Sequence, residues 1–137
     1  SKSDPSDMSR INMTDNAETI AKKIRKAKTD PDGLPSEVAG LEGRPEARNL
    51  VNIYAALADS SVEAVLDHAG GKQFSEFKPM LVDIAVEKLA PISTEMAQLM
   101  QDPAAIDQVL KDGADRAREI AAPILTKTYD IVGMLRS

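Results

Sequence analysis

The sequence contains no cysteine and no tryptophan, and only two tyrosines and two phenylalanines. Without cysteine the chain forms neither a disulfide nor a thiolate metal site, which suits a reducing compartment such as the cytosol. With the single histidine His68 it cannot build a metal site from several imidazoles, so we expect no metal site. The shortage of aromatic rings disfavours RNA binding by base stacking on a sheet. No catalytic set is complete among the residue types that remain.

Long apolar runs are also missing. No run approaches the roughly 20 residues that a membrane-spanning helix needs. No signal-peptide pattern is present either. The formal net charge of −5 argues against non-specific nucleic-acid binding but leaves room for a local basic patch. With 137 residues, of which 42% are hydrophobic, the chain has the size of one ordinary domain with a core of aliphatic side chains.

Apolar residues recur at helical spacing in five stretches, and no stretch alternates as a strand would. Asp15 and Ser60 are the expected N-caps of the first and third helices, because each is followed three residues later by a glutamate. The sequence predicts an all-α fold, a helical bundle of about five helices, or six if Gly113 divides the last. The expected helices cover about 15–28, 45–57, 60–69, 75–101 and 103–135.

The last expected helix carries a regular apolar stripe. Ile106, Val109 and Leu110 are predicted to be buried, and the alanines that follow have the spacing of close helix packing. Residues 29–44, in contrast, hold several prolines and glycines and should form a long surface loop. Its carboxylates Asp30 and Asp32 are expected to be solvated or to cap the turn.

The stretch KKIRKAK at 22–28 carries five cations in seven positions. Such a run is usually a solvated helix face, and cations are favoured near a helix C-terminus. The alternative is a stripe that contacts phosphates of a nucleic-acid backbone. Composition and periodicity leave both readings open and indicate only a soluble helical domain.

Short motifs, taken in order, indicate a family. SKSDPSD at the start resembles the end of the KMSKS loop of class I aminoacyl-tRNA synthetases. Four further segments resemble successive parts of the tryptophanyl branch of that family. They read INMTDNAETIAKKIRKAKTD, NLVNIYAAL, FKPMLVDIAVEKLAPI and VLKDGADRAREIA. The chain therefore resembles the C-terminal portion of a bacterial tryptophanyl-tRNA synthetase, and we expect a fragment that starts inside the KMSKS loop.

This resemblance implies a division into residues 1–13, the end of the KMSKS loop and a linker, and residues 14–137, a helical anticodon-binding domain. The complete enzyme would be a ligase that uses ATP with Mg²⁺ to activate tryptophan and then charges the tRNA for tryptophan. On this resemblance, the nucleotide-binding domain of the complete enzyme is expected outside this sequence. We therefore expect the fragment alone to be inactive and to bind no cofactor.

The resemblance also assigns roles to residues. Lys2 matches the second lysine of the KMSKS motif and is the expected catalytic residue, with Ser1 and Ser3 completing the ATP-binding loop. Arg48, Asn49 and Lys78 are candidates for tRNA binding. Asn49 could equally be a buried amide that packs between helices.

The family is dimeric, mainly through its catalytic domain, so a homodimer is expected for the intact enzyme and a monomer for the fragment. A cytoplasmic location without membrane contact is expected. Two other functions stay open on the sequence. One is an independent helical interaction module that docks through the basic helix. The other is a regulatory paralogue that binds tRNA without catalysis.

Overall fold

The computed structural model describes residues 4–133 and confirms the all-α fold. Within this range the regular structure consists of five α-helices and two short 3₁₀ helices, with no strand. In chain order these are η1 (Asp7–Ser9), α1 (Ala17–Lys26), η2 (Val38–Leu41), α2 (Pro45–Leu57), α3 (Val62–Ala69), α4 (Phe74–Gln101) and α5 (Pro103–Val132).

The chain divides into two compact units, Ser1–Met96 and Ala97–Ser137. The first unit holds α1, α2, α3 and most of α4, and it contains the hydrophobic core. The second unit holds the last turn of α4 and the whole of α5.

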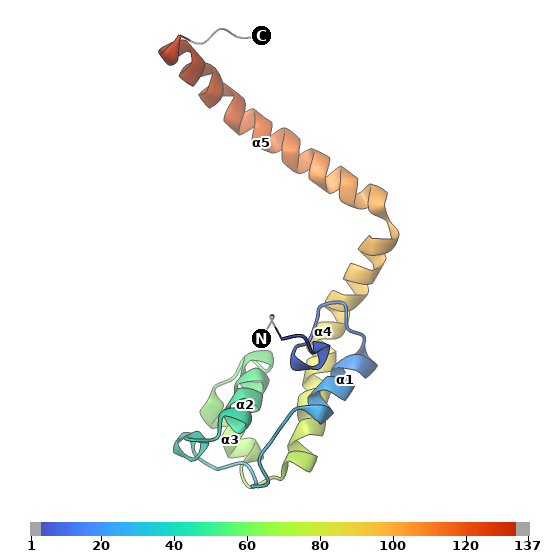
Figure 1. Ribbon diagram of the computed structural model, residues 1–137, viewed down its shortest axis with the longest axis vertical. Helices are drawn as coiled ribbons and strands as arrows, with labels where there is room; N and C mark the ends of the chain where they lie inside the picture. Colours follow the sequence, from blue (N-terminus) through green and yellow to red (C-terminus); the bar gives the residue numbers. More distant parts are fainter. Residues whose placement is uncertain (1–3, 134–137) are drawn as a thin grey trace. The chain divides into compact units, whose positions relative to one another are not determined.

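Helix α4 supplies the centre of the core in the first unit. Phe77, Leu81 and Ala85 lie at four-residue intervals along one face of α4 and are each 0% exposed. Helices α1 (blue), α2 and α3 (both green) lie beside the first half of α4 (yellow-green to yellow) in Figure 1. The ring of Tyr54 on α2 lies with its centre 5.6 Å from that of Phe77, a contact that adds to the burial of both. The other large side chains that are fully buried are Ile20, Leu41, Leu66 and Val51.

The expected N-caps were each one residue too early. The side chain of Asn16, not Asp15, accepts a hydrogen bond from the Thr19 backbone N–H at the start of α1. In the same way Ser61, not Ser60, caps α3. Asn, Asp and Ser are almost equally good caps, so two adjacent candidates cannot be separated by residue type.

The loop 29–44 contains more structure than its composition predicts. Leu34 and Leu41 are buried in the core, and η2 precedes the start of α2. The backbone of Leu34 exchanges hydrogen bonds of 2.8 Å with Lys72 and Gly71 in the turn between α3 and α4. Gly71 has a φ of +79°, a conformation that few other residues adopt. The loop is therefore fixed to the first unit at its middle.

Helix α5 corrects the expectation for the C-terminal stripe. It runs without interruption from Pro103 to Val132, so Gly113 does not divide it. None of its described residues is buried. Val109 and Leu110, predicted to be buried, are 69% and 65% exposed, and Ile106 is only partly covered.

Candidate functional site

A buried lysine joins the N-terminal segment to α1. The side chain of Lys23 is 3% exposed, and its Nζ lies 2.6 Å from an Asp15 carboxylate oxygen and 2.7 Å from one of Asp7. Asp15 is itself 9% exposed, whereas Asp7 is 57% exposed. One ammonium therefore binds a buried carboxylate on its inner side and a solvated one on its outer side.

Further hydrogen bonds hold the segment between Asp4 and Asp15 in place. The Asn12 amide donates to Asp7 over 2.8 Å, while the Asn12 backbone N–H donates to Asp15 over 2.9 Å. The Arg10 guanidinium donates to the Asp4 carbonyl over 2.9 Å and lies 3.6 Å from Asp7. The segment thus has a defined conformation from Asp4 onward. The expected ATP-binding residues Ser1, Lys2 and Ser3 lie outside the described residues.

The contacts of this network shift the pKa values of Lys23 and Asp7. Burial alone lowers the pKa of Lys23, but its hydrogen bonds to Asp15 and Asp7 outweigh burial and raise that pKa above its usual value. The hydrogen bond from Lys23, helped by that from Asn12, lowers the pKa of Asp7. Lys23 and Asp7 are therefore both charged around neutral pH, and the ion pair between them is fully formed.

The basic stretch 22–28 divides into side chains with different partners. Lys23 belongs to the buried network, so the interpretation of the whole run as a solvated face was wrong for this residue. Lys28 pairs with Glu46 of α2 at 3.1 Å. Lys22, Arg25 and Lys26 are exposed on α1. The Lys28 side chain is also 85% exposed, so four of the five cations of the stretch face solvent.

Lys78 of α4 caps the C-terminus of α1. Its Nζ donates to the Ala27 carbonyl over 2.7 Å and to the Arg25 carbonyl over 3.2 Å. The last carbonyls of a helix lack partners within the helix, and a cation also offsets the negative end of the helix dipole. Burial lowers the pKa of Lys78. The ammonium has three N–H groups, of which these two bonds use two.

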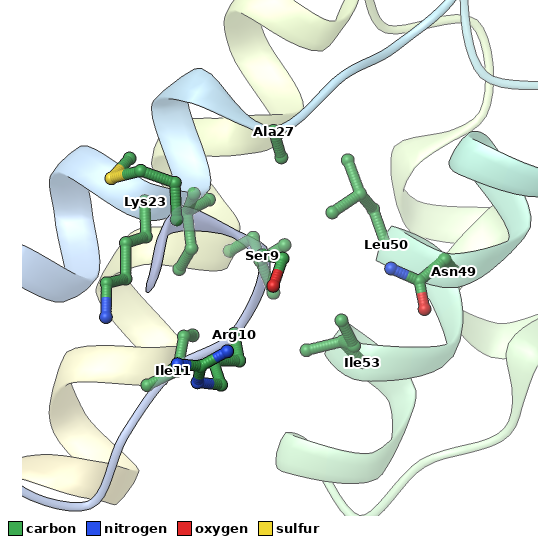
Figure 2. A pocket seen from close by; sticks show the side chains of 11 residues that line it. Ser9, Arg10, Ile11, Lys23, Ala27, Asn49, Leu50 and Ile53 are labelled. Atoms are coloured by element: carbon green, nitrogen blue, oxygen red, sulfur yellow. The ribbon is translucent and has the colours of Figure 1, made fainter. Parts of the chain in front are cut away.

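Arg48 and Asn49 lie in the first turns of α2, and both are exposed. The alternative reading of Asn49 as a buried packing amide is therefore wrong. Asn49 lines a largely apolar cavity of about 230 Å³ in the first unit. Figure 2 shows Ser9 and Arg10 of the N-terminal segment on one side of this cavity, and Asn49 with Leu50 of α2 on the other.

Two of the three tRNA-binding candidates, Asn49 and Lys78, lie near the C-terminal end of α1. Lys78 binds the Ala27 carbonyl, and the Ala27 side chain lines the same cavity as Asn49. The ion pair between Lys28 and Glu46 holds the start of α2 next to the end of α1. Arg48 follows Glu46 by two residues on α2, so it points away from the side of the helix that carries Glu46. Sequence spacing alone could not bring positions 49 and 78 to the same helix end.

Sequence reasoning missed Arg44, which organises the long loop. Its guanidinium binds both carboxylate oxygens of Asp30 and donates to the carbonyls of Gly33 and Asp32. The expected capping role of Asp30 is confirmed in part, since its carboxylate also accepts from the Asp32 backbone N–H. An arginine before a helix-starting proline has no sequence signal that predicts four such bonds.

The described residues contain no group of three or more histidine, cysteine, aspartate or glutamate side chains placed to hold a metal ion. Among them no helix is long and apolar enough to cross a membrane. His68 lies exposed in the last turn of α3.

Comparison with known proteins identifies the class. The family described as tRNA synthetases class I (W and Y) matches residues 1–89, which is more than half of the chain. The chain belongs to this family of class I aminoacyl-tRNA synthetases.

The individual relatives show which branch of this family the chain resembles, because those compared below are all tryptophan–tRNA ligases. The chain is 61% identical to the tryptophan–tRNA ligase of Mesorhizobium japonicum over 99% of its own length, and 60% identical to that of Brucella melitensis over 100%. The chloroplastic/mitochondrial tryptophan–tRNA ligase of Arabidopsis thaliana is 37% identical over 97% of the chain. The chain spans only 38%, 39% and 32% of these three proteins.

Proposed function

We propose that this chain forms the C-terminal part of a tryptophan–tRNA ligase. The observation that carries the proposal is the match of the chain, over almost its whole length, to tryptophan–tRNA ligases. The complete enzyme would activate tryptophan with ATP, delivered with Mg²⁺, and then charge the tRNA for tryptophan. It would act in the cytoplasm as a homodimer, with this chain monomeric when isolated.

Residues 1–13 would supply the end of the loop that closes over ATP. The Lys2 ammonium would offset the negative charge that develops on the departing pyrophosphate, while Ser1 and Ser3 would shape the loop around the nucleotide. A charge placed in this way acts in the transition state rather than on ground-state binding. The anchoring of the following segment, from Asp4 onward, supports a defined position for the base of this loop.

Residues 14–137 would bind the anticodon arm of the tRNA. The position of Asn49 and Lys78 near the end of α1 supports this, with Arg25 and Lys26 exposed on α1 and Arg48 exposed on α2. RNA is recognised by contacts to phosphates and by hydrogen bonds to the edges of unstacked bases. The Asn49 amide can both donate and accept at a base edge. Lys78 would contact a phosphate through the N–H that does not bind α1.

The test is tryptophan-dependent ATP–pyrophosphate exchange by the complete protein that carries this chain. We expect activity, and we expect Lys2→Ala to lower kcat about a hundredfold, the usual effect of removing one transition-state contact. KM for tryptophan should stay close to its original value, because Lys2 would not contact the amino acid. The substitution Lys26→Ala serves as the control for loss of a cation elsewhere.

An active enzyme whose Lys2→Ala variant keeps its kcat would contradict the role of Lys2. A complete protein without tryptophan-dependent exchange would contradict the proposed function as a whole. It would favour the helical interaction module instead.

A further inference from the structure

The buried position of Lys23 calls for a reason beyond stability. Taking an ammonium and a carboxylate out of water costs several kcal/mol per ion, and an apolar pair of similar volume often serves a core equally well. Yet Lys23 as a whole residue is only 4% exposed, and it lies on the same helix face as Ile20 and Ile24. Unlike an apolar pair, an ion pair fixes the position of particular partners, because an ammonium binds oxygen atoms through directed hydrogen bonds.

Both partners of Lys23 belong to the segment that precedes α1 and follows the proposed end of the KMSKS loop. Asp15 lies directly before the N-cap of α1, and Asp7 lies eight residues earlier. The bond to Asp15 is buried and fixes the ammonium. The bond to Asp7 reaches outward to η1, where Asn12 and Arg10 also contact the Asp7 carboxylate.

We infer that Lys23 and Asp7 are positioning residues for the loop that carries Lys2. This inference rests on the proposed function. Lys23 holds Asp7 against α1, and Arg10 holds the Asp4 carbonyl next to the same carboxylate. The base of the ATP-phosphate loop is thereby fixed to the helical unit.

The chain length between the anchor and the loop makes this fixation effective. Asp7 follows Lys2 by five residues, and Asp4 follows it by two. Five residues span at most about 17 Å when fully extended. The pair between Lys23 and Asp7 therefore restrains the chain five residues after Lys2. A restraint so close to a reacting group lowers the entropy that must be lost to bring that group into position.

The variant Asp7→Asn tests this role without disturbing the buried pair. Asp7 is 57% exposed, and Lys23 keeps its bond to Asp15, so the variant should fold and keep its Tm within a few degrees. In the complete enzyme we expect kcat for tryptophan activation to fall about fivefold, with KM for tryptophan unchanged. The matched control Glu46→Gln, which breaks the ion pair between Glu46 and Lys28, should leave kcat unchanged.

A double-mutant cycle with Lys2→Ala separates positioning from general stability. If Asp7 acts through Lys2, Asp7→Asn should cause no further loss of kcat once Lys2 is alanine. Equal losses in both backgrounds, or no loss from Asp7→Asn alone, would overturn the positioning role while leaving the proposed function intact. A parent enzyme without exchange activity would overturn both.

Discussion

Arg44 shows how one side chain can shape a long loop. Its guanidinium has five N–H donors in a fixed plane, and four hydrogen bonds join it to Asp30, Asp32 and Gly33. These bonds satisfy carbonyl oxygens that the turn would otherwise leave to water. Arg44 therefore holds residues 30–33 next to the start of α2.

The ion pair between Arg44 and Asp30 makes the stability of the fold depend on pH. The hydrogen bond from Arg44 lowers the pKa of Asp30 below its usual value of 3.8. A carboxylate with a lowered folded pKa stabilises the fold above the unfolded pKa, and that contribution is lost as pH falls through the folded pKa. We therefore expect the Tm to fall as the pH drops below about 4. The slope over this range should be smaller in Asp30→Asn. Thermal unfolding followed by circular dichroism measures it.

Asp32→Asn is the matched control for this titration, because it removes a neighbouring exposed carboxylate whose side chain does not bind Arg44. Its acid-induced loss of Tm should resemble that of the original chain. An Asp30→Asn variant with an unchanged slope would show that the pair with Arg44 contributes no acid sensitivity.

Asp15 marks the limit of residue-level prediction. The pattern DNAE fits an N-cap at Asp15 as well as at Asn16, because both residue types cap helices. The difference arises from Lys23, which takes the Asp15 carboxylate for an ion pair. Such a pair depends on the path of the N-terminal segment, and no local pattern reports that path.

At the scale of elements, α2 carries exposed polar side chains, one of which belongs to the proposed tRNA-binding surface. Asn49 and Asn52 are both exposed, but only Asn49 lines the cavity beside the end of α1. The two amides lie one turn apart on one helix. They therefore offer a matched pair of substitutions.

We expect Asn49→Ala to raise KM for tRNA in aminoacylation about fivefold, the net worth of roughly one hydrogen bond. Tryptophan activation without tRNA should not change. Asn52→Ala should change neither value. Steady-state aminoacylation by the complete enzyme measures both, and equal effects of the two substitutions would contradict a contact specific to Asn49.

The elements themselves were largely predictable, and their surroundings were not. Helical spacing of apolar residues located all five helices, and Pro45 and Pro103 marked two starts correctly. The same spacing predicted buried apolar residues on α5, but none of the described residues of α5 is buried. Periodicity reports that a helix has an apolar face, but it does not report what covers that face.

At the scale of the molecule, the two units should respond differently to the same substitution. Leu81 is 0% exposed in the core of the first unit, whereas Leu110 on α5 is 65% exposed. We expect Leu81→Ala to lower the free energy of unfolding of this chain by about 2–5 kcal/mol, because it leaves a cavity. Leu110→Ala should change it by less than about 0.5 kcal/mol. Urea denaturation measures both, and similar losses would mean that α5 is buried in solution.

The candidate site was predictable only where a motif carries it. SKSDP predicts the ATP-binding residues Ser1, Lys2 and Ser3, because the motif is contiguous in the sequence, and this stays a prediction. The network of Lys23 with Asp7, and the gathering of Asn49 and Lys78 around α1, join positions far apart in the chain. They follow from the packing of α1, α2 and α4, which a single sequence does not specify.

The cap that Lys78 places on α1 has a consequence for the order of folding. A ten-residue helix is marginal in water by itself, and its last carbonyls here receive their donor from a residue 51 to 53 positions later. Closing so long a stretch of chain costs entropy that only the packing of α4 repays. We therefore expect the end of α1 to form only when α4 docks, so that the first unit folds cooperatively rather than from its N-terminus onward.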